Sequence, residues 1–419
     1  MKVAFVSQPY DAILPPRQNS IGLITYNTAI EMGRNAEVTI FGRRRTGVTS
    51  PTELPFRVSF VSSLSDNVLQ HVATHYPRWV ARLGVQAIAD TYSGYARAVS
   101  SALDSYGPDV VHVMNYWPWC RRLRGKADKR CVVLEMHAEW LSQMDPVEVG
   151  SALEATDAVT AVSDHIARQI RASFPTYRGD VVTTYNGVNI GQFHPRPDRD
   201  PASDDAIRIL FVGRVSPEKG VHTLIEAMPQ VVSRIKGVRL DIVGGRSTLR
   251  GDFLVDISSD PLVRSLKRFY DGSMGSEYQT YLDGLVARLG VSQNVRFLGH
   301  VPHEELPDRY RMAALVVNPS LSESFGVSIV EGMASGVPVV GTRIGGMLDT
   351  VVDGETGLLV EPERPDLLAD AVVSLLGDPI RAKQMGIDGR ARAVECFSWR
   401  ARSDRLLSTY RKILNECRM

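Results

Sequence analysis

The sequence predicts an α/β fold divided between two domains. Its 419 residues exceed what one ordinary hydrophobic core accommodates. Short apolar runs of strand length alternate with helical patterns along most of the chain, which is typical of parallel sheets covered by helices. The run 194–201 is rich in proline and aspartate and has the composition of an exposed linker. We expect an N-terminal domain over 1–197, a C-terminal domain over 198–398, and a last helix, 399–419, that returns to the N-terminal domain.

Composition and charge exclude several classes of protein. The apolar fraction of 44% and the charged fraction of 23% are ordinary for a soluble globular protein, and a net charge of +1 gives no support for a nucleic-acid partner. No segment has the ~18 apolar residues of a membrane span. Because the N-terminus enters a strand directly, we expect no secretory signal. The four cysteines show neither metal-ligand nor C-x-x-C spacing, so we expect free thiols in a reducing cytoplasm.

The N-terminal half opens with a strand at 3–6, a polar loop, and a helical pattern over 21–32. Gly22 lies where this helix begins. Its missing side chain would let a ligand oxygen approach the free backbone N–H groups of the helix start. A simple turn residue explains Gly22 equally well, so both interpretations stand at this point.

Further apolar runs predict the rest of the N-terminal sheet, and the patterns between them predict helices. The expected strands are 37–41, 56–61, 109–114, 132–136, 157–162 and 181–184. The expected helices lie within 66–106 and over 164–171, where Ser163 is the expected N-cap.

Two features at strand ends of this half have open interpretations. His137 follows the strand 132–136 at the edge where α/β sheets bind ligands, so it is either a donor to a phosphate or sugar oxygen or a structural histidine. The stretch 115–126 joins three aromatic residues to four cations. It fits an acceptor-facing or membrane-touching surface, and it also fits a solvated helix start with a packed aromatic anchor. The basic run 43–45 has a similar pair of explanations.

The C-terminal half repeats the alternation of strands and helices. The expected strands are 207–212, 240–243, 295–299, 313–317, 337–340 and 357–360, the last at an edge. The expected helices are 221–231, 277–289, a start near Gly326, and those from 365 onward. The segment 246–276 is polar and poorly periodic, and we interpret it as an insertion or mobile flap.

A glycine-bearing loop, 213–220, follows the first strand of this half and carries Arg214 and Lys219. The spacing is not that of a P-loop, because no Gly-Lys-Ser/Thr follows a four-residue gap. Two cations in a strand–loop–helix unit suit a diphosphate, whose charge they neutralise without a metal. The alternative is an exposed basic turn.

The stretch 319–336 is the one around which the chain is organised. A buried strand leads into a polar loop with Glu323, and a helix then begins near Gly326 and carries Glu331 in its first turns. Free N–H groups at a helix start attract a phosphate or a polarised sugar oxygen. Because carboxylates repel phosphate, we expect both glutamates to accept hydrogen bonds from hydroxyls. A nucleotide sugar, with a diphosphate between a ribose and a hexose, meets these conditions. The backbone after the strand 295–299, at Val301, is expected to contact the nucleobase edge.

Together these motifs resemble the retaining GT-B glycosyltransferases of family 4, also called group 1. The resemblance covers most of the chain and is strongest over 200–400. It rests on Gly213-Arg214, Lys219-Gly220, Glu323 and Glu331 with seven residues between them, Phe297-Leu298-Gly299, Asn186-Gly187-Val188, and Phe397-Ser398-Trp399.

The resemblance implies two Rossmann-like domains that face each other across a cleft, with the donor held by the second and the acceptor by the first. It implies that Arg214 and Lys219 bind the diphosphate and that Glu331 binds the ribose hydroxyls. The remaining site residues that it implies are Glu323 and the backbone of Ser324, Phe325, Gly326 and Val327 for the transferred sugar, His137 near the reacting centre, and Gly22 at the phosphate. The first loop, Asn19-Ser20-Ile21-Gly22, departs from the paired-glycine form of the family, and 246–276 has no general counterpart in it.

The expected reaction moves a hexose from a nucleoside-diphosphate sugar to an acceptor hydroxyl, with retention at the anomeric carbon and with no metal or other cofactor. Both glutamates are committed to hydroxyls, so we expect a front-face substitution in which the leaving phosphate takes the acceptor proton. The family makes a UDP-sugar the expected donor. The expected acceptor is a sugar, a polysaccharide or a lipid-linked molecule, with peripheral membrane contact in the last case.

Four alternatives remain open from the sequence. They are a GDP-mannose-dependent transferase, a nucleotide-sugar 2-epimerase of similar architecture, a phosphorylase with lysine-bound pyridoxal phosphate, and a non-catalytic nucleotide-sugar sensor. An epimerase would convert the donor without an acceptor, and a phosphorylase would show the absorbance of its cofactor. The full set of cations and carboxylates disfavours a sensor.

Overall fold

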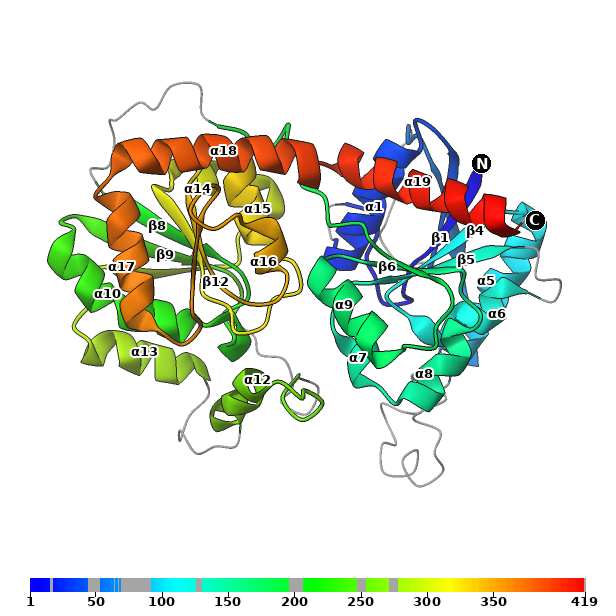
Figure 1. The fold of residues 1–419 in the computed structure, drawn as a ribbon, viewed down its shortest axis with the longest axis horizontal. Helices are drawn as coiled ribbons and strands as arrows, with labels where there is room; N and C mark the ends of the chain where they lie inside the picture. The colour runs from blue at the N-terminus through cyan, green and yellow to red at the C-terminus, as the bar shows by residue number, and fades with distance from the viewer. Residues whose placement is uncertain are drawn as a thin grey trace. The chain divides into compact units, whose positions relative to one another are not determined.

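The computed structural model describes residues 1–15, 18–43, 53–63, 65–66, 68, 92–125, 130–195, 206–246, 254–270 and 278–417. Contacts divide the chain into two compact units, one of Met1–Gly187 with Trp399–Met419 and the other of Val188–Ser398 (Figure 1). The division lies after Gly187 instead of the expected residue 197. The ring of Phe193 packs 5.6 Å from that of Tyr310, and its carbonyl accepts a hydrogen bond from Arg390, so this segment packs with the second unit.

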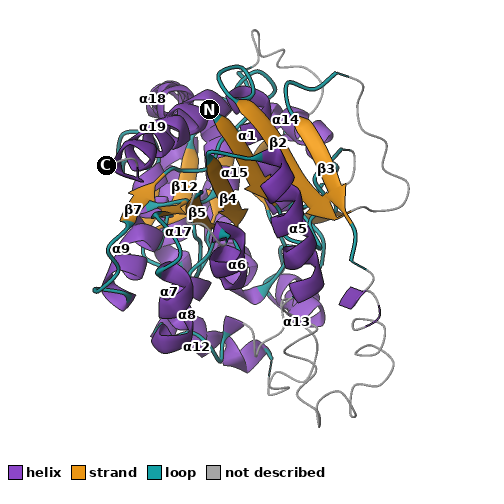
Figure 2. Cartoon of the chain, turned by 90° about the vertical axis from the view of Figure 1, so that its right-hand side faces the viewer, coloured by secondary structure: helices purple, strands orange, loops and turns teal. Residues whose placement is uncertain are grey.

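The first unit contains a seven-stranded parallel sheet with the order β3-β2-β1-β4-β5-β6-β7. Figure 2 shows β2 and β3 side by side at one edge. Its inner strands are buried on both faces, as apolar runs predict. The strands are β1 (Lys2–Val6), β2 (Glu37–Arg43), β3 (Arg57–Val61), β4 (Val110–Met114), β5 (Cys131–Met136), β6 (Ala158–Ala161) and β7 (Asp180–Thr183).

Two helices from opposite ends of the chain, α1 (Ser20–Met32) and α19 (Trp399–Cys417), pack together on this sheet. Leu406, Leu407 and Ile413 of α19 share one apolar core with strands β1, β2, β4 and β5. The C-terminal helix therefore returns to the N-terminal domain, as the sequence predicts. The other described helices are α5 (Ser93–Tyr106), the 3-10 turn η1 (Trp117–Trp119), α6 (Cys120–Arg124), α7 (Trp140–Gln143), α8 (Pro146–Leu153) and α9 (Asp164–Ser173).

The second unit contains a six-stranded parallel sheet with the order β10-β9-β8-β11-β12-β13. Both sheets therefore have the strand order of Rossmann-like domains, and β13 lies at an edge as expected. The strands are β8 (Ile207–Val212), β9 (Val238–Val243), β10 (Val295–Gly299), β11 (Leu315–Asn318), β12 (Val339–Thr342) and β13 (Leu358–Val360). The helices include α10 (Val221–Arg234), α13 (Tyr278–Arg288), α14 (Leu306–Met312), α15 (Val327–Ala334), α16 (Met347–Thr350), α17 (Pro365–Leu376) and α18 (Pro379–Phe397).

The segment 246–276, expected to be an insertion or mobile flap, is described at residue 246 and over 254–270. The latter range contains α12 (Pro261–Ser265) and the 3-10 helix η3 (Leu266–Phe269), and it is not structureless. Leu266 and Phe269 belong to the apolar core of the second unit. Short helices with few apolar residues give a weak periodic signal, which is why the sequence pattern misses them. Of the helical pattern expected within 66–106, the structure shows α5 as a helix. Residues 69–91 lie outside the described residues.

One buried histidine of the second core makes folding stability depend on pH. His222 of α10 is 3% exposed, and its Nδ1 lies 2.9 Å from the hydroxyl of Tyr278. Burial, helped by the charge of Arg268, lowers the pKa of His222 from 6.5 to about 3. The folded protein therefore keeps this ring neutral in a pH range where the unfolded chain protonates it.

We predict that the free energy of unfolding falls more steeply with acid in the wild type than in a His222→Gln variant. A lowered folded-state pKa contributes stability that is complete above about pH 6.5 and is lost as the pH falls toward 3. The difference between the two proteins should change by about 1.4 kcal/mol per pH unit within that window. Urea unfolding between pH 6 and 4 measures it, with the exposed His300→Gln as control. Parallel curves for wild type and His222→Gln would contradict the prediction.

Candidate functional site

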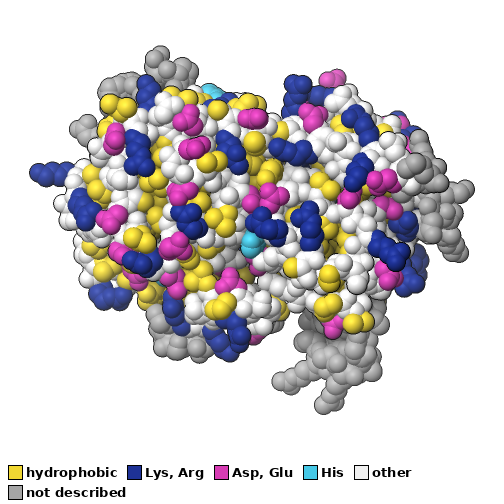
Figure 3. All heavy atoms as spheres, in the orientation of Figure 1, with side chains coloured by type: hydrophobic (Ala, Val, Ile, Leu, Met, Phe, Trp, Pro, Cys, Tyr) yellow, Lys and Arg dark blue, Asp and Glu magenta, His cyan; other side chains and the backbone are white. Residues whose placement is uncertain are grey.

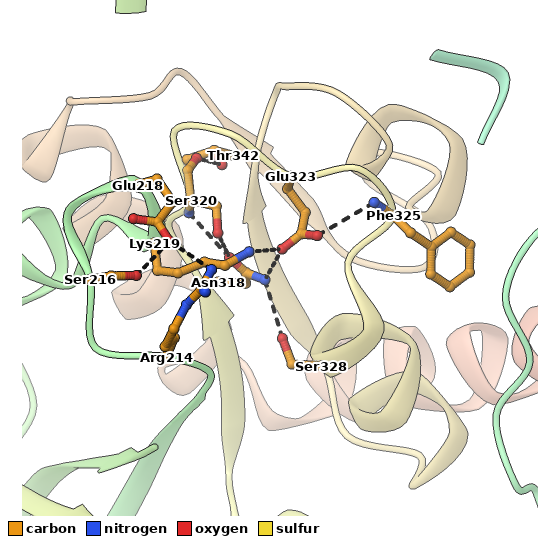
Figure 4. Close-up of polar contacts among 10 residues, drawn as sticks. All are labelled: Arg214, Ser216, Glu218, Lys219, Asn318, Ser320, Glu323, Phe325, Ser328 and Thr342. Atoms are coloured by element: carbon orange, nitrogen blue, oxygen red, sulfur yellow. Dashed lines mark hydrogen bonds and ion pairs between the residues drawn. The ribbon is translucent and has the colours of Figure 1, made fainter. Parts of the chain in front are cut away.

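The two loops with the predicted diphosphate and sugar ligands leave neighbouring strands of the second unit. Strands β8 and β11 pair directly, and the strand order reverses between them. Ligands of open α/β sheets bind at the carboxyl ends of strands at such a reversal. The amide of Leu321 donates to the carbonyl of Glu218 at 2.8 Å, so the loops 213–220 and 319–326 lie in contact. Figure 4 shows Lys219 of the first loop beside Glu323 of the second.

Gly220 allows this close approach. Its φ of +64° is in the left-handed region that favours glycine. A Cβ added there would lie 2.0 Å from the carbonyl oxygen of Pro319. A side chain at position 220 would therefore push the two loops apart.

Arg214 is oriented by an acid that the sequence analysis did not single out. Its Nη2 donates to Glu218 Oε1 at 3.0 Å, and the hydroxyl of Ser216 donates to the same oxygen at 2.6 Å (Figure 4). Glu218 is 3% exposed, whereas 36% of the Arg214 side chain remains exposed. The guanidinium has five N–H donors, so it can hold Glu218 and still donate to a phosphate.

Lys219 and Glu323 form an ion pair between the two loops. The Lys219 Nζ lies 2.8 Å from Glu323 Oε2, and both side chains point toward one another in Figure 4. Burial raises the pKa of Glu323, but the charge and hydrogen bond of Lys219 and the backbone N–H groups of Phe325 and Gly326 outweigh it, so the net pKa lies below the ordinary value. Glu323 is therefore ionised at neutral pH.

Asn318, at the end of β11, supports the carboxylate and was not predicted. Its Nδ2 lies 3.5 Å from Glu323 Oε2 and donates to the hydroxyl of Ser328 at 3.2 Å. Its Oδ1 accepts the backbone N–H of Ser320 at 3.1 Å. The amide thus joins the loop to the start of α15 and fixes the direction of Glu323.

Helix α15 begins without a side-chain cap. Its N-cap residue, Gly326, has φ +92° and supplies no side-chain cap, and the N–H groups of Phe325 and Gly326 donate to Glu323. The ring of Phe325 packs 5.6 Å from that of Phe397, which leaves the backbone of Ser324 to Val327 as the polar part of this turn. Free N–H groups at a helix start suit an anion or a polarised oxygen, and the contact of this turn with the donor stays a prediction.

Glu331 of α15 is buried with two partners of its own. Its Oε2 accepts the hydroxyl of Tyr310 at 2.7 Å, and its Oε1 lies 3.0 Å from Nε2 of His303. Burial opposes the charged imidazole, but the hydrogen bond and charge of Glu331 raise the pKa of His303 above its ordinary value. Val301 precedes His303 by two residues in the loop after β10, so the expected nucleobase and ribose contacts lie near one another.

In the first unit, the structure supplies a packing reason for Gly22. A Cβ there would lie 1.9 Å from the carbonyl oxygen of Ala12. The N–H of Gly22 donates to Oδ1 of Asn19 at 3.0 Å, so this donor of the helix start already has a partner. The contact of Gly22 with phosphate stays a prediction.

His137 lies in a network that joins three strand-end loops of the first unit. Its backbone N–H donates to Oδ1 of Asn115, which follows β4, and the Asn115 carbonyl accepts from Gln8, which follows β1. Its Nε2 lies 2.9 Å from Oε1 of Glu135 in β5. Glu135 is fully buried and was not singled out by the sequence analysis.

The stretch 115–126 packs mainly as an anchor in its described part. Trp119 is 2% exposed, and its ring lies 5.3 Å from that of Tyr95. Arg124 pairs with Asp157 at 3.1 Å. Lys126 and positions 44 and 45 lie outside the described residues. Basic and acidic side chains are interspersed on the face that Figure 3 shows.

The described residues contain neither a candidate metal site nor a candidate membrane span. In those residues no cluster of three or more histidines, cysteines, aspartates or glutamates has the arrangement of a metal site. Likewise, none of the described helices combines the length and apolarity needed to cross a bilayer.

Comparison with known proteins identifies the family. Residues 196–392 match the family model "Glycosyl transferases group 1", and residues 24–192 match "Glycosyltransferase Family 4". A D-inositol 3-phosphate glycosyltransferase 1 of Catenulispora acidiphila is 31% identical over 373 residues, which cover 83% of this chain and 81% of that protein. The chain is a group 1, family 4 glycosyltransferase.

Two other glycosyltransferases are similar in sequence, and one solved structure has the same fold. A D-inositol 3-phosphate glycosyltransferase of Streptomyces avermitilis is 32% identical over 71% of this chain, and the match spans 59% of that protein's length. A GDP-mannose-dependent alpha-(1-6)-phosphatidylinositol monomannoside mannosyltransferase of Mycolicibacterium smegmatis is 30% identical over 68% of this chain and 71% of its own. A sucrose-phosphate synthase from Thermosynechococcus elongatus has the same fold, with TM-score 0.72, 23% identity and 99% of each chain covered.

We predict that Gly220→Ala destabilises this glycosyltransferase more than Gly290→Ala. Both glycines have positive φ, but a Cβ at Gly290 has nothing within 4 Å. Gly290→Ala should therefore cost only the backbone strain of about 1–2 kcal/mol. Gly220→Ala should cost roughly 1–3 kcal/mol more, because the Pro319 carbonyl must move. Urea denaturation compares the two variants, and equal losses would show that the loop contact is not tight.

Proposed function

We propose that this glycosyltransferase moves a hexose from a nucleoside-diphosphate sugar to an acceptor hydroxyl, with retention at the anomeric carbon and without a metal. The observation that carries the proposal is the Lys219–Glu323 ion pair, 2.8 Å long, where the loops after β8 and β11 meet. One loop supplies cations suited to a diphosphate, and the other supplies a carboxylate suited to sugar hydroxyls.

The donor diphosphate binds Arg214 and Lys219 in this proposal. The Lys219 ammonium has three donors, so it can keep its bond to Glu323 while it donates to a phosphate oxygen. Glu323, held ionised by Lys219, accepts hydrogen bonds from hydroxyls of the transferred hexose. The start of α15 adds the backbone N–H groups of Ser324 and Val327 to the same sugar or phosphate, while those of Phe325 and Gly326 donate to Glu323.

The nucleoside is assigned to Glu331 of α15 and to the loop after β10 in the same unit. Glu331 accepts hydrogen bonds from the ribose hydroxyls with the carboxylate lone pairs that Tyr310 and His303 leave available. Val301 contacts the nucleobase through its backbone. The acceptor is assigned to the first unit, and His137 to the reacting sugar, both by resemblance to the family.

The chemical step exchanges one bond to the anomeric carbon for another on the same face of the ring. The bond from this carbon to the leaving phosphate oxygen breaks, the acceptor oxygen forms the new bond, and the acceptor proton passes to the leaving phosphate. Negative charge grows on the leaving diphosphate in this step. Arg214 and Lys219 stabilise that charge from fixed positions, which is electrostatic catalysis. This step forms no covalent enzyme intermediate.

The first donor to test is a UDP-hexose, and the second is GDP-mannose. GDP-mannose is included because one relative is named as a GDP-mannose-dependent mannosyltransferase. The names of two other relatives make D-inositol 3-phosphate the first acceptor to test, beside sugars, polysaccharides and lipid-linked acceptors.

A transfer assay with each donor tests the proposal, and Lys219→Ala tests its carrying residue. Lys219→Ala should lower turnover by ~10²-fold or more, because it removes a charge that meets the developing negative charge. The exposed Lys383→Ala in α18 removes an equal charge elsewhere in the unit and should leave turnover unchanged. Proton NMR of the product gives the anomeric configuration.

Three outcomes would refute this function. Wild-type turnover in Lys219→Ala would show that Lys219 does not stabilise the leaving diphosphate. Donor epimerisation in the absence of acceptor would support the epimerase instead. An inverted product would refute retention.

We predict that Glu331→Gln weakens binding of a nucleoside diphosphate by about tenfold, through one lost charge-assisted hydrogen bond to the ribose. Glutamine keeps an acceptor for the buried Tyr310 hydroxyl, so the fold should tolerate the change. Calorimetry with the nucleotide and with its 2′,3′-dideoxy analogue measures the effect. The variant and the wild type should bind the dideoxy analogue equally, and a loss of the same size for both ligands would contradict the ribose contact.

A further inference from the structure

A buried cluster of charged and polar side chains lies directly behind His137 in the first unit. Its centre is Glu135, which is 0% exposed within strand β5. The cluster contains His112 from β4 and Arg402 from α19, and both contact the Glu135 carboxylate. The same carboxylate lies 2.9 Å from Nε2 of His137. Buried charges are expensive unless paired, so a cluster of this kind requires an explanation.

Arg402 neutralises Glu135, and each of its three nitrogens donates a hydrogen bond. Its Nη2 donates to Oε1 of Glu135, its Nε to the hydroxyl of Thr28 at 2.9 Å, and its Nη1 to the carbonyl of Tyr185 at 2.6 Å. It has the largest of the fully buried side chains among the described residues. Arg402 thus holds Glu135 in one orientation as well as in its ionised form.

The second oxygen of Glu135 is committed to His112. Oε2 lies 2.7 Å from Nε2 of His112, whose Nδ1 lies 2.7 Å from the hydroxyl of Tyr410 in α19. Burial lowers the pKa of His112 below its ordinary value, so the ring is neutral. A neutral ring that donates from Nε2 to the carboxylate must accept the Tyr410 hydroxyl at Nδ1. Oε1 of Glu135, which already accepts from Arg402, keeps a second lone pair for a further partner.

That oxygen faces His137. The Nε2 of His137 lies 2.9 Å from Oε1, and the side chain is 7% exposed. Among the described residues, neither ring nitrogen of His137 has a well-aligned hydrogen bond. The other charged groups around it are Arg402 and, on the loop after β1, Asp11, whose pKa burial raises while His137 lowers it. A carboxylate next to Nε2 favours a proton on that nitrogen and leaves Nδ1 as an acceptor.

We propose that Glu135, fixed by Arg402, is a positioning residue that keeps the proton of His137 on Nε2 and leaves Nδ1 to accept a hydrogen bond from a sugar hydroxyl. The role of Nδ1 toward sugar rests on the proposed function. The tautomer does not, because it follows from contacts within the first unit alone.

The test is the tautomer of His137 in the full-length protein, measured by nitrogen-15 NMR with labelled histidine and assigned with a His137→Gln variant. The wild type should show the proton on Nε2. A double variant, Glu135→Leu with Arg402→Met, removes both charges together, which buried ion pairs often tolerate without loss of the fold. In this variant the two tautomers of His137 should become mixed. Tyr410→Phe is the matched control, because it changes the same cluster without altering either contact of Oε1, and should leave the tautomer unchanged.

Activity then provides an independent readout. The double variant should lower kcat by ~10-fold or more with little change in the KM for donor. Added to His137→Gln, the same two substitutions should cause no further loss, as expected for residues that act through one another.

A wild-type His137 with its proton on Nδ1, or a tautomer unchanged in the double variant, would overturn the proposal even if the protein proves to be an active transferase. Conversely, the predicted tautomer in a protein without transferase activity would retain the role of Glu135 and refute the function. Additive losses in the His137→Gln background would also overturn the proposal. If the double variant fails to fold, the wild-type spectrum still tests the proposal, because a proton on Nδ1 of His137 would overturn it.

Discussion

The hydrogen bond from the amide of Leu321 to the carbonyl of Glu218 is the contact on which the candidate donor site depends. Parallel pairing of β8 with β11 brings two loops to one place, but the loops meet only because Gly220 has no side chain in front of the Pro319 carbonyl. Once they meet, Lys219 reaches Glu323. A cation and an acid from sequence positions far apart thus become a single unit, and sheet topology alone would not place them so closely.

Each charged side chain of the second unit that is assigned to the donor has a partner within the protein. Arg214 is held by Glu218, Lys219 by Glu323, and Glu331 by His303 and Tyr310. These partners fix side chains that would otherwise lose rotamer entropy on binding. A bound diphosphate therefore contacts cations that are already ordered. The repulsion between Arg214 and Lys219 is already offset by their partners, Glu218 and Glu323. Preorganisation of this kind is what electrostatic stabilisation of a leaving group requires.

The sequence predicted the fold class, the strands and their approximate ends, and the loops with Arg214, Lys219 and Glu323, because strand periodicity and strand-end loops are local features. It did not single out Glu218, Asn318, Tyr310 or Glu135, whose importance comes from partners far away in the chain. Glu135 is one acid in an apolar run of β5, and Arg402 is one of several arginines in α19. A charged residue inside a buried strand was the available signal, since such residues are rarely buried without a partner.

The position of Arg402 explains why α19 belongs to the first unit by chemistry as well as by packing. Apolar residues of this helix complete the core over β1, β4 and β5, and any apolar side chain of suitable size would serve that purpose at position 402. An arginine there costs desolvation, and a hydrophobic pair with a residue other than glutamate at 135 would be at least as stable. The pair is therefore poorly explained by stability. It is better explained by what Glu135 does to the ring of His137, whose Nε2 lies 2.9 Å from Oε1 and whose two ring nitrogens have no well-aligned hydrogen bond among the described residues.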